Sequence, residues 1–145
     1  KNCVFTNILG SAINVYRGGN DESTLGPFVT IENCTINEVD NREQGSALRL
    51  LGAQYARVLH TNFVNSGQGG RSLEFREFRW DDILVDHCNF YQSGKVDTYY
   101  NKALGKQIFE IKPEFVNIKE FDFNLKDGSA LSSKTKAAGG VGASL

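Results

Sequence analysis

Hydrophobic and polar positions alternate along short segments of this chain, and the segments recur. The clearest one occupies residues 29–36, with the sequence VTIENCTI, and it aligns with residues 56–63 and 83–90. Residues 1–5 match the end of an earlier copy. Equivalent positions in these copies are separated by steps of 31, 27 and 27 residues, which is within the period of solenoid repeats. The pattern therefore predicts a stack of similar coils.

A second alternating segment lies between these copies. It occupies residues 12–16, 47–51 and 72–76, and residues 108–112 provide a fourth candidate. A glycine stands shortly before each of the first three segments, as expected where a chain turns sharply before a strand. Period-2 alternation over segments of this length predicts short β-strands.

The alternation also predicts which side chains point into the core. In the second segment, the two inward rows are Ile13, Leu48, Leu73 and Phe109, and Val15, Leu50, Phe75 and Ile111. In the first segment, they are Ile31, Val58 and Val85, and Ile36, Phe63 and Phe90. We expect each row to run along the stack, because paired strands of neighbouring coils lie about 4.8 Å apart.

The phase of the alternation slips by one residue in the middle of the first segment, at Asn33, His60 and His87. Such a slip indicates a corner between two strands, and Asn adopts the left-handed conformation of a corner more readily than most residues. Each coil then contains three short strands: one before the corner, one after it and one after the glycine. The chain is predicted to be all-β, a right-handed parallel β-helix of about four coils with a C-terminal cap.

Two other folds fit the sequence less well. A leucine-rich repeat would show the spacing Leu-x-x-Leu-x-Leu, which is missing. An antiparallel sandwich also contains short strands, but it would not align polar corner residues at a fixed phase.

The pattern divides the chain into three parts. Residues 1–112 are predicted to form the coils of a fragment of a longer solenoid. Pro113 interrupts the next strand, and residues 113–130 are expected to cap the open end of the stack. Residues 131–145 are small and polar, so we expect a loosely ordered tail. The first coil has no cap and the sequence has no Met, so we expect preceding β-helix coils of the same parent protein as a partner.

Composition and charge narrow the possible partners. Of the 145 residues, 40% are hydrophobic and 23% are charged, as in ordinary globular domains. The formal net charge is −1, so no strong positive field favours nucleic acid or an anionic membrane. No apolar run reaches the roughly 18 residues of a membrane span. We therefore expect neither nucleic acid nor a membrane as a partner.

The coils resemble those of the pectin-lyase-like superfamily. The segments IENCTI at 31–36 and VDHCNF at 85–90 carry the resemblance, together with PEFVN at 113–117 and DFNLKDGSA at 122–130. More narrowly, these segments resemble the C-terminal β-helical region of chondroitinase B-like polysaccharide lyases, which include alginate lyases. The resemblance covers most of the chain.

This resemblance implies a parent enzyme that cleaves an acidic polysaccharide, alginate or a glycosaminoglycan, by β-elimination. In such enzymes a Lys serves as base, an Arg assists, and Ca²⁺ held by Asn and Glu neutralises the uronate carboxylate. No Lys-Ser motif lies on a strand next to Glu74 and Arg76, so we expect no catalytic residue and no cofactor in this part. The resemblance also implies a secreted or periplasmic bacterial protein. The alternatives are a catalytic fragment and a structural β-helix of a surface adhesin or phage spike.

The best candidate binding surface is the outer face of the strands that follow the glycines. Alternation places two outward rows there, Asn14, Arg49, Glu74 and Glu110, and Tyr16, Leu51, Arg76 and Lys112.

These two rows, together with Trp80 in the loop at residues 78–82, carry the predicted substrate-binding residues. Arg49, Arg76 and Lys112 are candidates for contacts to uronate carboxylates, which Arg binds in a bidentate manner. Tyr16 or Trp80 is a candidate for contact with a sugar ring. The competing interpretation is a plain surface ion pair between Arg49 and Glu74, with Trp80 covering the edge of the core.

Three other groups of residues have chemistry that could form a site. Residues 20–22 offer hard oxygen ligands for Ca²⁺, but their spacing fits no defined loop, and no metal site is predicted. His60 and His87 match Asn33 in position, so the corner explains them better than a role as general base. The cysteines share one inward position that suits a small core residue, and a disulfide between Cys3 and Cys34 is left open.

Overall fold

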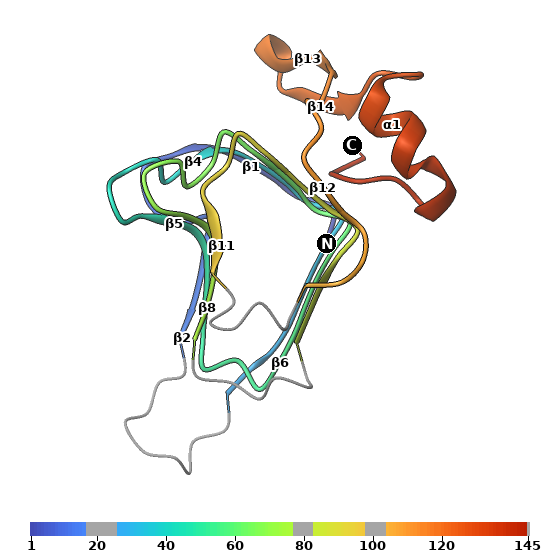
Figure 1. Cartoon of the computed structure of the whole chain (residues 1–145). Coiled ribbons are helices and arrows are strands. Elements are labelled where there is room, and N and C mark those ends of the chain that lie inside the picture. Colours follow the sequence, from blue (N-terminus) through green and yellow to red (C-terminus); the bar gives the residue numbers. More distant parts are fainter. Residues whose placement is uncertain (17–25, 77–82, 98–103, 145) are drawn as a thin grey trace.

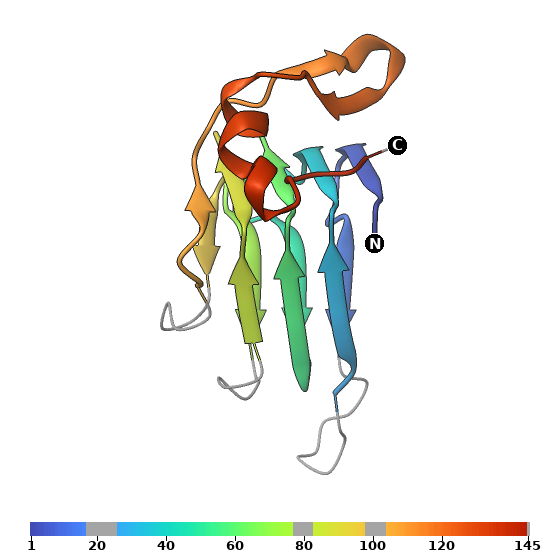
Figure 2. The same ribbon diagram turned by 90° about the vertical axis from the view of Figure 1, so that its right-hand side faces the viewer.

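The chain forms three parallel β-sheets that wind around a common axis (Figure 1). The computed structural model describes residues 1–16, 26–76, 83–97 and 104–144. The strands of each sheet come from successive coils, and Figure 2 shows them side by side with the first coil at one end of the stack. The fold is the right-handed parallel β-helix that the sequence predicts.

Each sheet takes one strand from each coil that it crosses. Sheet A contains, in order, β1 (Val4–Ile8), β4 (Thr35–Val39), β7 (Asn62–Val64), β10 (Cys88–Tyr91) and β12 (Ile108–Phe109). Sheet B contains β2 (Ile13–Tyr16), β5 (Ser46–Leu51), β8 (Arg71–Arg76) and β11 (Lys95–Asp97). Sheet C contains β3 (Phe28–Glu32), β6 (Tyr55–Leu59) and β9 (Ile83–Asp86).

The predicted polar corner lies between sheets C and A, and the structure confirms it. The four residues that occupy it have φ between +49° and +57°, in the left-handed region, and they are Asn2, Asn33, His60 and His87. The residue that follows the corner is also similar from coil to coil, because its side chain makes the same hydrogen bond each time. Cys34 Sγ, Thr61 Oγ1 and Cys88 Sγ each donate to the carbonyl oxygen two residues earlier, at 3.4, 2.9 and 3.2 Å. All three cysteines of the chain are free thiols.

The inward rows of the first three coils are confirmed by the strand register. Ile36 lies opposite Phe63, and Phe63 lies opposite Phe90. The rings of Phe63 and Phe90 stack with 4.7 Å between their centroids. Leu48 and Leu73 are paired in sheet B and are fully buried. Apolar side chains at equivalent positions of successive coils therefore pack along the axis and form one continuous core.

The fourth coil differs from the prediction. Residues 108–112 do not continue sheet B, because β12 pairs with β10 in sheet A and places Ile108 opposite Cys88. The fourth place in sheet B belongs to β11, where Val96 lies opposite Leu73. Phe109 and Ile111 therefore do not extend the rows of Leu73 and Phe75. Period-2 alternation identifies a strand but not the sheet that it joins.

A second row of left-handed residues lies at, or just after, the C-terminal ends of strands β1, β4, β7 and β10 of sheet A. Its members have φ between +47° and +55°, and they are Asn7, Glu38, Asn65 and Gln92. The sequence does not reveal this second corner, because Glu and Gln do not mark a left-handed position as Asn does.

The segment after residue 112 packs on the outside of the coils. A hairpin consists of β13 (Phe115–Asn117), the 3-10 helix η2 (Ile118–Glu120) and β14 (Asp122–Leu125). Phe115 and Phe123 meet edge to face, with centroids 5.2 Å apart, and cluster with Val64 of sheet A. The hairpin, which belongs to the predicted capping segment at residues 113–130, therefore covers the outer side of sheet A.

The segment predicted to be a loosely ordered tail is described as far as residue 144, and this part carries helical structure. It contains the helix α1 (Ala130–Thr135) and the 3-10 helix η3 (Lys136–Ala138). The side chain of Ser129 caps α1 by accepting from the Ser132 amide. Leu131, Val141 and Ala143 are buried, and burial of these apolar groups holds the tail on the coils.

Residues 140–144, here called the C-terminal strap, run back along the polar corner toward the first coil (Figure 2). The Gly142 amide donates to the His60 carbonyl at 2.8 Å, and the Ala143 amide donates to Thr35 Oγ1 at 3.1 Å. At its end, the Ser144 amide donates to Asn2 Oδ1 at 2.9 Å, and Asn2 Nδ2 donates to the Ser144 carbonyl at 2.6 Å. The strap thus bonds to three successive coils.

Candidate functional site

The outer face of sheet B gathers the charged side chains that the sequence analysis selected. Parallel pairing places Asn14 beside Arg49 and Arg49 beside Glu74, and Asp97 continues this row. Tyr16, Leu51 and Arg76 form the neighbouring row. Both outward rows are confirmed in the first three coils, with Asp97 in the place predicted for Glu110.

Glu74 is the centre of this face. Its side chain is only 5% exposed, and its two carboxylate oxygens are both engaged. Oε2 accepts from Ser46 Oγ at 2.7 Å and from Arg49 Nε at 3.0 Å, while Oε1 accepts from Arg76 Nε at 2.7 Å. A buried carboxylate needs such partners, because an unpaired charge in that position costs several kcal/mol.

Opposing influences act on the pKa of Glu74. Burial is the largest and raises the pKa, but the hydrogen bonds from Arg76 and Ser46 and the charges of Arg49 and Arg71 lower it. The net result is a pKa below the ordinary value. Glu74 is therefore an anion near neutral pH, and it is poorly suited to accept a proton from a substrate.

A second buried carboxylate stands at the edge of the same face. Asp40, in the turn between β4 and β5, is 2% exposed. It accepts from Arg42 Nε at 2.7 Å and from the Ser46 amide at 3.1 Å. Gly45 makes room for it, because a Cβ atom there would lie 2.5 Å from Asp40 Oδ1. The glycine that precedes the strand thus also allows the carboxylate to pack against the turn.

A third carboxylate, that of Asp97, lies on β11, the last strand of sheet B. Asp97 accepts from Arg71 Nε at 3.0 Å and from an Nη atom of Arg76 at 3.5 Å. Arg76 therefore connects Asp97 with Glu74. We call the surface formed by Arg42, Arg49, Arg71 and Arg76, with Asp40, Glu74 and Asp97, the arginine face.

The arginine face remains open to solvent although its carboxylates are covered. The four arginine side chains are between 30% and 57% exposed. A cavity of about 360 Å³ lies over this face, and its lining includes Arg42, Arg49, Arg71 and Glu74. Four cations against three anions leave the face with a small positive excess. An anionic group in the cavity would meet guanidinium groups whose counterions are mostly buried beneath them.

The structure brings together some of the predicted site residues and separates others. Arg49, Glu74 and Arg76 form one bonded group, and Tyr16 belongs to the same face and is 59% exposed. Lys112 does not lie on this face, which corrects its prediction. It follows β12 of sheet A and lines a groove beside the hairpin. Trp80 and residues 20–22 lie outside the described residues.

Four charged residues of this face do not follow from the sequence pattern: Asp40, Arg42, Arg71 and Asp97. Arg71 stands three positions before Glu74, so strict alternation assigns it to the inward phase. Asp40 and Arg42 lie in a turn, where alternation makes no prediction. Asp97 belongs to the strand that was not recognised. The glycines before the strands could nevertheless have pointed to these residues. Each such glycine marks a turn, and side chains of a turn can pack beside the strand that follows it.

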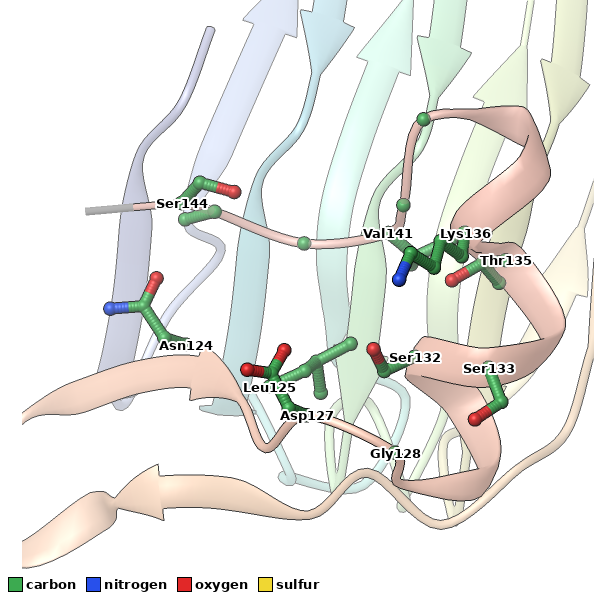
Figure 3. Close-up of a pocket in the computed structure, with 14 residues that line it drawn as sticks. Asn124, Leu125, Asp127, Gly128, Ser132, Ser133, Thr135, Lys136, Val141 and Ser144 are labelled. Atoms are coloured by element: carbon green, nitrogen blue, oxygen red, sulfur yellow. The ribbon is translucent and has the colours of Figure 1, made fainter.

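A larger cavity, of about 720 Å³, lies between β14, α1 and the C-terminal strap. Figure 3 shows Asp127 and Ser132 pointing toward its middle, with Lys136 and Val141 on the opposite wall. It contains one carboxylate and one ammonium group, and none of the residues selected from the sequence. Because its charged groups are isolated rather than bonded into an array, the arginine face is the stronger candidate site.

Within residues 1–16, 26–76, 83–97 and 104–144, no three His, Cys, Asp or Glu side chains converge to hold a metal ion. No helix in that part is long and apolar enough to cross a membrane. Comparison with known proteins finds no protein-family model and no curated protein that matches the chain.

Proposed function

We propose that this chain is the C-terminal β-helical domain of a secreted or periplasmic polysaccharide lyase, and that its arginine face binds an acidic polysaccharide. The parent enzyme would cleave alginate or a glycosaminoglycan by β-elimination. In this proposal the present domain supports the catalytic coils and holds the substrate, and it supplies no catalytic residue.

The arrangement of Arg49 and Arg76 around Glu74 is the observation that carries the proposal. Each guanidinium is fixed through its Nε atom, and more than a third of each side chain remains exposed. Guanidinium groups bind carboxylates through paired N–H donors. Because Glu74 restricts the rotamers of both arginines, less side-chain entropy is lost when a uronate binds.

The state of the carboxylates supports a role in binding rather than in catalysis. Glu74 and Asp40 are buried and engaged by arginines, and the pKa of Glu74 is lowered. A general base needs a free lone pair directed at the substrate and a pKa near the working pH. The lowered pKa of Glu74 does not meet that requirement, and the arginines that bond to Glu74 and Asp40 keep both carboxylates from a substrate.

The outer end of the first coil has a surface on which the proposed preceding coils could pack. β1, β2 and β3 are outermost strands of sheets A, B and C. Phe5 and Ile13 are only partly buried there, whereas their partners in the next coil, Ile36 and Leu48, are fully buried. Another parallel coil would cover these apolar side chains and pair the strand edges.

A titration with alginate hexasaccharide, followed by NMR of the backbone amides and repeated with a dermatan sulfate hexasaccharide, tests the proposal. We expect shifts in β5 and β8 and an affinity that falls as salt is added. Arg49→Gln should weaken binding about tenfold, the effect of one charge-assisted hydrogen bond. In that variant the Glu74 carboxylate still accepts hydrogen bonds from Arg76 and Ser46. Lys126→Gln, an exposed lysine away from sheet B with the same loss of charge, should bind normally.

The same samples test the non-catalytic role. Prolonged incubation with polymeric alginate or dermatan sulfate should give no ultraviolet absorbance from unsaturated chain ends. Formation of such ends by this chain alone would contradict the non-catalytic role.

A structural β-helix of a surface adhesin or phage spike is the second candidate. The pairing of every arginine of the face with a carboxylate of the same face favours it. Pairs such as Arg49–Glu74 and Arg71–Asp97 join neighbouring coils, so they would stabilise the stack even if the face bound no ligand. This candidate predicts that neither acidic hexasaccharide shifts the amides of sheet B.

A further inference from the structure

A groove separate from the arginine face lies beside the hairpin, and it crosses three successive coils. Its volume is about 290 Å³, at the lower end of the range of ligand pockets. The coils contribute Glu38, Asn65 and Gln92, one from each, together with Tyr91. Lys112 and the hairpin residue Ile118 also line it. At a strand spacing of about 4.8 Å, the groove follows the long axis of the stack.

One wall of the groove is a repeated row of hydrogen-bonding side chains. Glu38, Asn65 and Gln92 occupy equivalent positions of the second corner, and all three have left-handed backbones. Glu and Gln gain no local stabilisation in that conformation, which is uncommon for residues other than Gly, Asn and Asp. Residues held in such sparsely populated conformations cluster at ligand-binding sites. The row presents a carboxylate and two amides at the spacing of the coils.

The Asn65 side chain has an unmet hydrogen-bonding capacity. Its Oδ1 atom is buried and has no hydrogen-bond partner among the described residues. A buried acceptor without a donor is destabilising, and the terminal torsion of Asn is broad enough to turn the amide toward the groove. A hydroxyl group in the groove would supply the missing donor.

The opposite wall is apolar and comes from the hairpin. Ile118 is 53% exposed where it borders the groove. Its neighbours Val116 and Phe121 are also large hydrophobic side chains that are at least 50% exposed. Tyr91 is half-buried at the base, where it packs against the cluster of Phe115 and Phe123. The hairpin thus offers apolar surface opposite a polar row.

The charges that line the groove balance each other. Glu38 and Lys112 are its only charged lining residues among those that the structure describes, and they leave no net charge to attract an ion from a distance. A ligand that fits must combine hydroxyl groups, for the amides and the carboxylate, with a C–H face, for the hairpin. This combination is the chemistry of a pyranose ring.

We propose that this groove binds a short oligosaccharide through its hydroxyl groups, with the sugar chain lying along the axis of the stack. The groove recognises features that neutral and acidic glycans share. Its binding therefore depends little on salt, in contrast to binding at the arginine face, and it does not rest on the function proposed for that face.

The test is an NMR titration of the whole chain with cellohexaose, as the neutral probe, and with alginate hexasaccharide, as the acidic probe. Both are measured at low and at high NaCl concentration. We expect both probes to shift the amides of Asn65, Gln92 and Ile118 at either salt concentration. Gln92→Ala should weaken both affinities roughly 3- to 10-fold, through the loss of neutral hydrogen bonds. Asn7→Ala is the matched control, because Asn7 belongs to the same left-handed row but does not line the groove.

The outcomes separate the groove from the arginine face. Arg49→Gln should leave the groove shifts unchanged. The inference is overturned if cellohexaose shifts none of the groove amides in the folded protein, or if only alginate does so and salt abolishes its binding. If both probes bind in the groove while sheet B shows no shift, the groove inference stands and the proposed role of the arginine face fails.

Discussion

The imidazole rings of His60 and His87 stack at one corner of successive coils, with centroids 4.8 Å apart and 24° between their planes. Their separation matches the strand spacing of a β-sheet. Each ring also has a polar partner: His60 Nδ1 lies 3.0 Å from the Gly140 carbonyl oxygen, and His87 Nδ1 lies 3.3 Å from Asp86 Oδ2. The stack follows from the repeat, because both residues occupy the left-handed position of the corner.

This corner predicts the effect of substitutions at His87. Asn tolerates the left-handed conformation, whereas a β-branched residue meets a steric penalty of about 1–2 kcal/mol. His87→Val should therefore unfold at a lower urea concentration than His87→Asn, with a difference of about that size in the free energy of unfolding. Equal unfolding midpoints for the two variants would show that the backbone conformation does not limit stability here.

The lowered pKa of Glu74 predicts a pH-dependent contribution to stability. In the unfolded chain the carboxyl group takes up protons near its ordinary pKa of 4.5, whereas in the folded protein its pKa is lower. The stabilisation is therefore complete above about pH 4.5 and is lost as the pH falls through the folded-state value. Urea unfolding of the wild type and Glu74→Gln from about pH 7 to about pH 3 measures this.

We expect Glu74→Gln to be less stable than the wild type near neutral pH and the difference to shrink in acid. Glu43→Gln is the control, because Glu43 is exposed in the turn before β5 and should show no such trend. A difference between wild type and Glu74→Gln that stays constant across this pH range would contradict the prediction.

The strap predicts different effects for two neighbouring glycines. Gly140 and Gly142 both have positive φ, +85° and +94°, so alanine at either position strains the backbone by about 1 kcal/mol. At Gly142 a Cβ atom would also lie 2.9 Å from Thr35 Oγ1, while at Gly140 it would meet nothing within 4 Å. Gly142→Ala should therefore be the more destabilising change. Faster hydrogen exchange at Ala143 in Gly142→Ala than in Gly140→Ala measures it, and identical exchange rates argue against a close-packed strap.

The three thiols should differ in reactivity. Cys3 is exposed, whereas Cys34 and Cys88 are buried. Burial raises the pKa of the Cys88 thiol to about 12, so almost none of the reactive thiolate forms at pH 8. A thiol reagent should label Cys3 rapidly and the other two only after denaturant is added. Cys3→Ser should remove the rapid phase, and rapid labelling of a second thiol in native buffer would refute the buried placement.

The sequence contains most of the information about the coils, because each coil repeats the same physical requirements. Ile36, Phe63 and Phe90 recur at one phase since a row of the core runs through every coil. Asn33, His60 and His87 recur since a corner needs a left-handed residue. Both features are visible as a period, and the structure confirms both.

The errors lie where the repeat weakens. Val96 is the only large apolar residue of β11, so this strand carries no alternation that would distinguish it from a loop. The stronger alternation at 108–112 predicts the fourth strand of sheet B instead of β11. It therefore places Lys112 on the wrong face. The position of the hairpin depends on contacts between Phe115, Phe123 and sheet A, which have no counterpart in the repeat.

The candidate site could be predicted only in part for a related reason. Arg49, Glu74 and Arg76 follow from alternation along straight strands. Asp40 and Arg42 reach the face from a turn, and side chains in turns follow local geometry rather than a period. The burial of Glu74 also depends on Ser46 from the preceding coil, so it is a property of the assembled stack.

The hydrogen bonds between Asn2 and Ser144 join residues that are 142 positions apart. In an ordinary solenoid each coil interacts only with its neighbours, so the outermost coil can detach without disturbing the rest. Here the first coil is also tied to a segment that follows the last one. Detaching the first coil would therefore also break the hydrogen bonds between Asn2 and Ser144 and free the end of the strap. This coupling raises the cooperativity of unfolding, so the two ends of the β-helix should open in one concerted step.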